Sequence, residues 1–398
     1  SIKKKNNNLY KKFKNHKRNK KVASINLKNP RPEKLEIFNK LFFSVAEQMG
    51  EVLQNTAQSI NVKERLDFSC ALFDNNGNLI ANAPHIPIHL GAMSDTIKFL
   101  LKNNKDQFLN GETLLHNDPY SGGTHLPDLT VVTPLLDKNK HKILFFFANR
   151  AHHSDIGGIT PGSMPAFSKS ILEEGLVFKG FSLLKNNKIL DEKIIKELKI
   201  TNFPSRDPEQ NLNDIKAQIA SCKKGIAEMK KIIDHYSLEI VNKYIKFVNK
   251  NCTEVIKKII KNIKNASFSL PLDNGSIVKL TMGYNNKKKK LEIDFNGTSK
   301  LLKNNFNTPK SVTRSVITYF LRTLVEEDIP LNEGVLKDVD LIFPKDSMLN
   351  PVFPAPVVAG NVETSQTIID VLNGATSVQA SCYGTMSNIT FGNKSFGY

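Results

Sequence analysis

The chain has 398 residues, of which 40% are hydrophobic and 24% charged, and its formal net charge is +18. This length and hydrophobic content are typical of a globular protein with two or three domains. No apolar run approaches the ~20 residues of a membrane-spanning helix, and no secretory segment is recognisable near the start, so we expect no membrane association.

The positive charge does not by itself indicate a nucleic-acid-binding protein. Residues 1–29 contain eleven Lys and Arg residues and no acidic residue, which leaves a net charge of +7 for the remainder. Only seven of the 56 basic residues are Arg, whereas phosphate recognition favours the bidentate guanidinium. We therefore expect no nucleic-acid partner and keep a basic nucleic-acid-binding protein as the non-enzyme alternative. Residues 1–30 are predicted to be a disordered tail or linker.

The cysteines are few and widely separated: Cys70, Cys222, Cys252 and Cys382. Without any CxxC spacing, they favour reduced thiols and a cytoplasmic protein over a disulfide framework or a zinc ribbon. The chain begins with Ser and ends shortly after an apparent strand. We therefore expect it to be part of a longer polypeptide.

The first predicted elements are a helix and a hairpin. Apolar residues recur at helical spacing from Glu33 to Gln54 and predict an amphipathic helix. The segment 61–73, the turn 74–77 and the continuation 78–81 predict a β-hairpin.

The Pro-rich segment 83–93 predicts a loop that precedes a helix from Ser94 to Leu101. Its prolines exclude a helix joining His85 and His89, so these two residues cannot form a helical i,i+4 metal pair. Both can still line a site as acid/base groups or substrate contacts, although each alone is more often a structural histidine.

The densest group of His, Asp and Gly residues lies between positions 116 and 164. Inside it, the apolar runs Leu129–Leu136 and Ile143–Phe147 predict a buried strand pair joined by the polar turn 137–141. Because a hairpin returns its two ends to one place, the residues that flank the pair should be neighbours.

The flanking residues are candidates for one shared site: His125, Asp128, His152, His153 and Asp155. Imidazoles and carboxylates that converge in a Gly-rich loop suit a divalent metal.

Three other acidic residues have two interpretations each. Asp118, which precedes Pro119, either caps a turn or takes part in the site. Glu173 and Glu174 either complete a metal shell or cap a turn, and the capping role is favoured.

The second half of the chain begins with helical patterns. The segment 206–265 is predicted to contain three helices. The first is long, with Asn211 or Asn213 as its N-cap, and the other two lie at 238–247 and 255–263. This Lys-rich region is expected to be a hairpin on the surface or at a subunit interface.

From Ala266 the apolar period changes to two and predicts a hairpin over 276–295, followed by a helix at 310–326 and a strand at 335–343. The polar stretch 359–366 then opens a helix. It either caps that helix or forms a ligand-facing loop at a helix N-terminus, which favours anions.

Together, these patterns predict a mixed α+β protein with several lobes. We expect a β-rich metal-binding lobe at residues 31–205, a helical segment at 206–265 and a second α/β lobe at 266–398.

Six segments resemble the hydantoinase B/oxoprolinase family. They are Lys63–Phe73, Ala83–Gly91, Gly122–Asp128, His152–Pro165, Asp294–Thr298 and Ala359–Gln366. The motifs are long and follow one another in order, and the resemblance covers residues 33–398. Within the family, Ser44–Gly50 and Asn61–Cys70 look closest to the ATP-dependent 5-oxoprolinases.

The resemblance implies that two modules share the reaction. A hydantoinase A-type subunit or domain binds ATP and phosphorylates the substrate oxygen. The B-type module, represented by this chain, carries a divalent metal of the Mn, Mg or Zn type and completes the hydrolysis of 5-oxo-L-proline to L-glutamate, a step of glutathione metabolism. This chain lacks a Gly-x-x-x-x-Gly-Lys-Ser/Thr loop, so we expect ATP to bind to the partner. An oligomer is also implied.

Two related enzymes remain as alternatives, an N-methylhydantoinase B subunit and an acetone carboxylase α-like subunit. Family members usually continue beyond a motif like Thr390–Gly392, so the resemblance also implies truncation at the C-terminus.

Carried over residue by residue, the resemblance implies His125, Asp128 and His153 as metal ligands, with His152 as the alternative to His153. His152 and Asp155 are then expected in supporting or acid/base roles. His89 and Asp118 complete the predicted catalytic residues.

Overall fold

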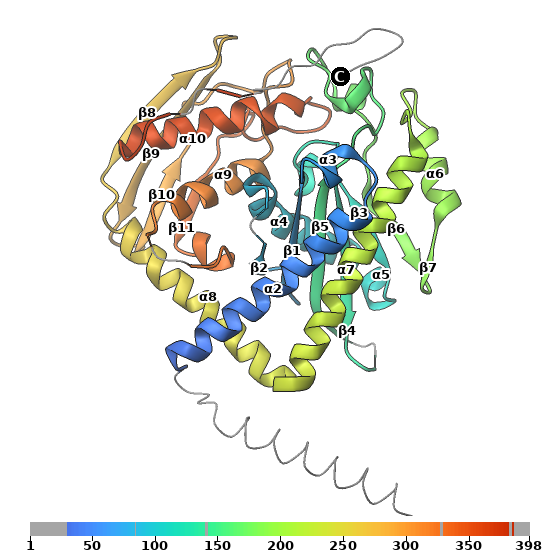
Figure 1. The fold of residues 1–398 in the computed structure, drawn as a ribbon. Helices are drawn as coiled ribbons and strands as arrows, with labels where there is room; N and C mark the ends of the chain where they lie inside the picture. The colour runs from blue at the N-terminus through green and yellow to red at the C-terminus, as the bar shows by residue number, and fades with distance from the viewer. Residues whose placement is uncertain (1–29, 84, 140–141, 327–328, 382–383, 386–398) are drawn as a thin grey trace, which may run out of the picture.

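The computed structural model describes residues 30–385, apart from positions 84, 140–141, 327–328 and 382–383. The predicted tail, Cys382 and the motif at 390–392 lie outside the described residues. Two sheets form the framework (Figure 1), one with the strand order β2-β1-β5-β4-β3-β6-β7 and one with the order β11-β10-β9-β8. The predicted mixed α+β class is confirmed.

All neighbouring strands of the seven-stranded sheet are antiparallel. The strands are β1 (Phe68–Asp74), β2 (Leu79–Asn82), β3 (Thr113–His116), β4 (Asp128–Leu136), β5 (Ile143–His152), β6 (Lys179–Lys185) and β7 (Lys188–Ile189). The helices of this part are α2 (Pro32–Thr56), α3 (Ile60–Lys63), α4 (Pro87–Asn103), α5 (Lys105–Leu109), α6 (Asp191–Lys199), α7 (Pro208–Tyr236) and α8 (Leu238–Ile260).

Helices cover both faces of this sheet. Side chains alternate between the two faces along each strand, and apolar residues occupy both of them. In β1, Cys70 and Leu72 belong to the apolar cluster shared with α2 and α7, whereas Ala71 and Phe73 belong to the cluster shared with α4 and α5. The central strands are therefore buried on both sides.

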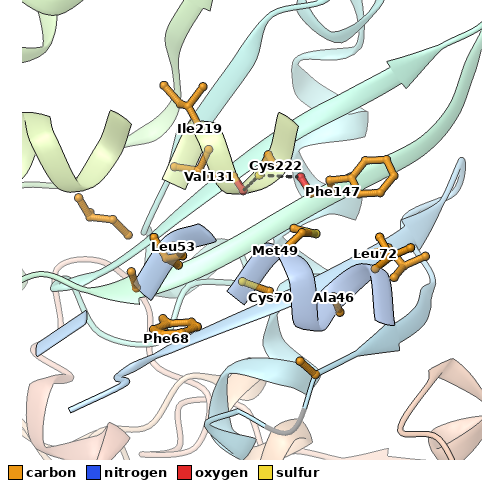
Figure 2. Packing of buried hydrophobic residues seen from close by; sticks show 14 of the residues in the cluster. Ala46, Met49, Leu53, Phe68, Cys70, Leu72, Val131, Phe147, Ile219 and Cys222 are labelled. Carbon is orange, nitrogen blue, oxygen red and sulfur yellow. Dashed lines mark hydrogen bonds between the residues drawn. The ribbon is translucent and has the colours of Figure 1, made fainter. Parts of the chain in front are cut away.

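Figure 2 shows the α2 and α7 side of the core, where Met49, Phe147 and Cys222 pack together. The Cys222 thiol lies 3.4 Å from the carbonyl oxygen of Phe147, which gives this buried sulfur a polar partner. The prediction that the helical region forms a surface hairpin is wrong for α7. This helix buries one whole side against α2, β4 and β5, because its apolar and small residues recur at helical spacing.

Two predicted helix boundaries are also wrong. Helix α4 begins at Pro87 rather than at Ser94, because proline is tolerated at the first helical position, where its missing N–H needs no partner. His89 thus lies in the first turn, while His85 stays outside the helix. The helices predicted at 238–247 and 255–263 are one helix, α8, since no Pro or Gly separates them.

The second sheet consists of β8 (Ala266–Pro271), β9 (Ile277–Asn285), β10 (Lys290–Asp294) and β11 (Val339–Ile342). The helices α9 (Lys310–Thr323) and α10 (Glu363–Thr376) accompany it. Helix α10 packs on β8 and β9, and α9 packs against α4 of the first sheet. At that crossing the backbones approach closely, since a Cβ on Gly91 would lie 2.8 Å from Cα of Ser315. The two sheets are therefore joined through a helix pair.

No helix among the described residues is long and apolar enough to cross a membrane.

Gly225 of α7 provides a test of this packing. A Cβ at this position would lie 2.5 Å from Sδ of Met49 and 2.6 Å from Cδ1 of Phe147. We predict that Gly225→Ala lowers the free energy of unfolding by about 1–3 kcal/mol, because overpacking outweighs the gain in helix propensity. Denaturant titration measures the change. Asn242→Ala, at an exposed position of α8, is the control and should change stability by less than ~0.5 kcal/mol. Equal or higher stability of Gly225→Ala would contradict the packing.

Candidate metal centre

The register of the β4–β5 hairpin brings Asp128 and His152 together. The two residues are direct cross-strand partners, so their side chains lie on the same face of the sheet. Oδ1 of Asp128 lies 3.0 Å from Nδ1 of His152. The predicted return of the hairpin ends to one place is confirmed for this pair.

The loop before β4 adds His125. Gly122 has φ = 104°, and a Cβ there would lie 2.2 Å from the backbone nitrogen of Thr96 in α4, so only glycine allows this approach. The buried Arg150 fixes the loop by donating to the Gly122 carbonyl and to the Thr96 hydroxyl, both at 3.0 Å. The loop thereby places Nε2 of His125 3.0 Å from Oδ1 of Asp128.

Helix α4 and Thr124 contact the other oxygen of the same carboxylate. Nε2 of His89 lies 3.3 Å from Oδ2 of Asp128, and the Thr124 hydroxyl donates to that oxygen at 2.5 Å. Nδ1 of His89 lies 3.2 Å from the Ser69 hydroxyl, which orients the ring. Three histidines from three separate elements therefore surround one fully buried carboxylate.

The electrostatics favour an ionised Asp128. Burial alone would raise its pKa, but His125 and His89 outweigh burial and hold the pKa of Asp128 well below its usual value. Burial would likewise lower the pKa of His152, and Asp128 reverses this effect and raises it. The centre therefore contains the buried carboxylate anion of Asp128, which a neighbouring positive charge stabilises.

The geometry fits a small cation. Nε2 of His125, Oδ1 of Asp128 and Nδ1 of His152 lie 3.0–3.1 Å from one another. Ligand atoms at about 2.1 Å from a tetrahedral ion are separated by roughly 3.4 Å, so little adjustment is needed. Atoms with lone pairs at these separations repel one another unless a proton or a metal lies between them. The donor set of two imidazoles and one carboxylate therefore fits a divalent transition metal.

His153 lies on the opposite face of the sheet. It follows His152, and successive residues of a strand point to opposite sides. Its Nε2 lies 3.0 Å from Oε1 of Gln218, and Nδ2 of Asn211 lies 3.1 Å from its Nδ1. Both ring nitrogens are thus engaged by α7, and Asn211 is not the helix N-cap, a role taken by Asp207. Burial lowers the pKa of His153, which favours a neutral ring.

Asp155 and Asp118 hold loops together. Asp155 accepts from the backbone nitrogens of Gly157 and Gly162 and forms an ion pair with Arg206 at 2.8 Å. Asp118 accepts from the Ser121 hydroxyl at 2.6 Å and from Lys179 at 2.9 Å.

Glu174 is buried away from the histidines. It accepts from the Ser168 hydroxyl and from the backbone nitrogens of Val357 and Val358, so it joins the segment before α10 to the segment that precedes β6. Burial outweighs these hydrogen bonds and raises the pKa of Glu174 to about 7.

A cavity of about 660 Å³ opens over the centre. His89, His125, Asp128 and His152 line one part of it. Sequence reasoning did not assign the other polar lining residues, which include Arg65, Asp67, Asn361, Ser365 and Gln366. The segment 359–366 carried a sequence signal, as a helix start that favours anions. Arg65 and Asp67 carried none beyond their place in a family motif.

Comparison with known proteins agrees with the resemblance seen in the sequence. Residues 31–398 match the family model described as hydantoinase B/oxoprolinase. The chain is 44% identical to 5-oxoprolinase 1 of Arabidopsis thaliana, covering 92% of this chain and 30% of the relative. It is 42% identical to 5-oxoprolinase of Saccharomyces cerevisiae, covering 91% and 29%. The chain thus spans less than a third of these relatives.

A solved structure shares the fold. The ATP-dependent caprolactamase from Pseudomonas jessenii superimposes with a TM-score of 0.75 at 21% identity, covering 87% of this chain and 60% of that chain.

The buried Glu174 predicts a pH-dependent stability. Since its pKa rises on folding from 4.5 to about 7, its contribution is complete below pH 4.5 and is lost as the pH rises through 7. Relative to Glu174→Gln, the wild-type free energy of unfolding should fall by up to about 3 kcal/mol between pH 4.5 and pH 8. Denaturant titrations of both proteins across this range measure the difference. Parallel pH curves would contradict the shifted pKa.

Proposed function

The chain belongs to the hydantoinase B/oxoprolinase family, and from this premise we propose that it is the metal-bearing module of an ATP-dependent cyclic amide hydrolase. The proposed reaction opens 5-oxo-L-proline to L-glutamate. The observation that carries this proposal is the group of His125, Asp128 and His152 in the wall of a cavity, in a chain more than 40% identical to proteins named 5-oxoprolinase.

In this proposal His125, Asp128 and His152 hold the metal, and His152 replaces the predicted ligand His153. A divalent ion bound there supplies Lewis-acid chemistry and a nucleophilic water at neutral pH. The geometry supports this choice because His153 is engaged at both nitrogens by Gln218 and Asn211.

The other residues of the centre position these ligands or move protons. His89 lines the cavity, its Nε2 lies 3.3 Å from Oδ2 of Asp128 and its Nδ1 is oriented by Ser69, which suits a group that exchanges a proton with this carboxylate or positions it. Asp118 and Asp155, first expected in catalysis, are assigned to holding two loops: the one that carries His125 and the one that follows His152 and His153.

The chemistry explains why ATP would be needed. A lactam carbonyl is stabilised by amide resonance, and phosphorylation of its oxygen creates a good leaving group. We assign this step to an A-type ATP-binding module as partner. Two observations support this assignment: the chain has no phosphate-binding glycine loop, and it spans about 30% of the length of its relatives.

A second candidate is hydrolysis of another lactam or cyclic amide. The matching family model, described as hydantoinase B/oxoprolinase, favours it because that description covers hydantoinases as well as oxoprolinases. In this proposal the same metal centre acts on either substrate, and the residues of the remaining cavity wall determine which of them binds.

Metal content tests the ligand assignment. We predict that His152→Ala weakens metal binding by roughly tenfold or more, because a ligand is lost, whereas His153→Ala keeps the wild-type metal content. Elemental analysis of folded, purified protein measures both. His153→Ala lies one residue away on the other face and controls for local disruption. Loss of the metal in His153→Ala with retention in His152→Ala would contradict the assignment.

A coupled assay tests the reaction. The chain, combined with an A-type module, should form L-glutamate from 5-oxo-L-proline with consumption of ATP, and its kcat/KM should exceed those for hydantoin, caprolactam and acetone. Asp128→Asn should abolish turnover and leave the fold intact. A preference for another substrate, or turnover without ATP, would overturn the proposed function.

A further inference from the structure

The cavity over the metal centre has a second polar wall, formed by the start of α10. Asn361, Val362, Ser365 and Gln366 line it together with the histidines. These residues belong to the last turn before α10 and to its first turn. The second lobe therefore supplies part of the cavity that contains the centre of the first lobe.

The N-terminus of α10 is suited to an anion. The first N–H groups of a helix lack intrahelical acceptors, and the helix dipole adds partial positive charge at this end. Helix α10 has 14 residues, and no side chain caps its start. An anion in the cavity can therefore take the place of a cap.

Asn361 gives an independent indication of a ligand. Asn361 lines the cavity and is only 9% exposed, and its buried Oδ1 has no hydrogen-bond partner among the described residues. A buried polar atom without a partner is costly, so such an atom at a cavity wall indicates that a ligand completes it. An amide side chain can present either its oxygen or its N–H₂ group by rotation, so Asn361 can donate to an anion.

Arg65 adds a positive charge to the cavity. It lies between α3 and β1 and lines the cavity together with Asp67 and His152. A guanidinium binds a carboxylate through two parallel hydrogen bonds. The cavity thus combines a helix N-terminus, a buried amide and a guanidinium, the groups that recognise a carboxylate.

We propose that Asn361, the first turn of α10 and Arg65 form the subsite for the carboxylate of the lactam substrate. This inference rests on the proposed function, in which the substrate is 5-oxo-L-proline. In that molecule the ring nitrogen is flanked by the lactam carbonyl carbon on one side and by the carbon bearing the carboxylate on the other. The carbonyl then faces the metal centre, and the carboxylate faces α10.

The subsite makes the cavity selective. A lactam without a carboxylate leaves Asn361, the helix terminus and Arg65 without their partner, and the buried amide of Asn361 disfavours a ligand that leaves it unpaired. Selection between 5-oxo-L-proline and plain lactams therefore resides in this wall, while the metal centre is common to both.

Calorimetry with two lactams tests the subsite. The metal-loaded chain, combined with its A-type module, is titrated with 5-oxo-L-proline and with 2-pyrrolidinone, which has the same ring without the carboxylate. Wild type should bind 5-oxo-L-proline more tightly. Asn361→Asp and Arg65→Gln should each raise its Kd by about tenfold or more and change that of 2-pyrrolidinone by less than about twofold.

Asn373→Asp is the matched control. It makes the same asparagine-to-aspartate change, but at a residue of α10 that does not line this cavity. It should leave both affinities within about twofold of wild type. Equal losses for both lactams in the Asn361 and Arg65 variants, or wild-type binding without preference for the carboxylate, would overturn the subsite. Carboxylate-dependent binding without turnover of 5-oxo-L-proline would support the subsite and overturn the proposed function alone.

Discussion

The cross-strand pair of Asp128 and His152 determines most of the site. The hairpin register makes these residues direct partners, and the alternation of side chains assigns them to the α4 face of the sheet. The same alternation turns His153 toward α7, where Gln218 and Asn211 engage it. A slip of the register by one residue would exchange the two histidines and dismantle the centre.

The centre is built on rigid elements, and a buried positive charge supports it. Asp128 begins β4, His152 ends β5, and His89 lies in the first turn of α4, so the loop carrying His125 is the most adaptable part. Arg150 lies on the same face as Asp128 and holds that loop, although burial lowers the pKa of its guanidinium to about 10. Fixed ligand positions of this kind reduce the reorganisation needed when a cation binds.

The sequence predicted the parts of the site that depend on local pattern. Two apolar runs around a polar turn were enough to predict the hairpin and the meeting of its ends. The choice between His152 and His153 depends on which face of the sheet each side chain points to. The apolar pattern does not reveal this, because β5 extends five residues beyond its apolar run, to His152. The start of α4 at Pro87 does not follow from the sequence pattern, because a proline that breaks a helix interior is equally accepted at the first helical position. Arg65 and Asn361 line the same cavity although they are about 300 residues apart in the chain. Such a long-range arrangement produces no periodic pattern in the sequence.

Three atoms of His125, Asp128 and His152 face one another at this end of the hairpin, and we propose that they hold a divalent metal. A crystal structure of the metal-loaded protein, with anomalous scattering measured at the metal absorption edge, tests this assignment. We expect one strong peak within about 2.0–2.2 Å of Nε2 of His125, an oxygen of Asp128 and Nδ1 of His152. A peak beside His153, or no peak between these three atoms in protein that contains stoichiometric metal, would contradict it.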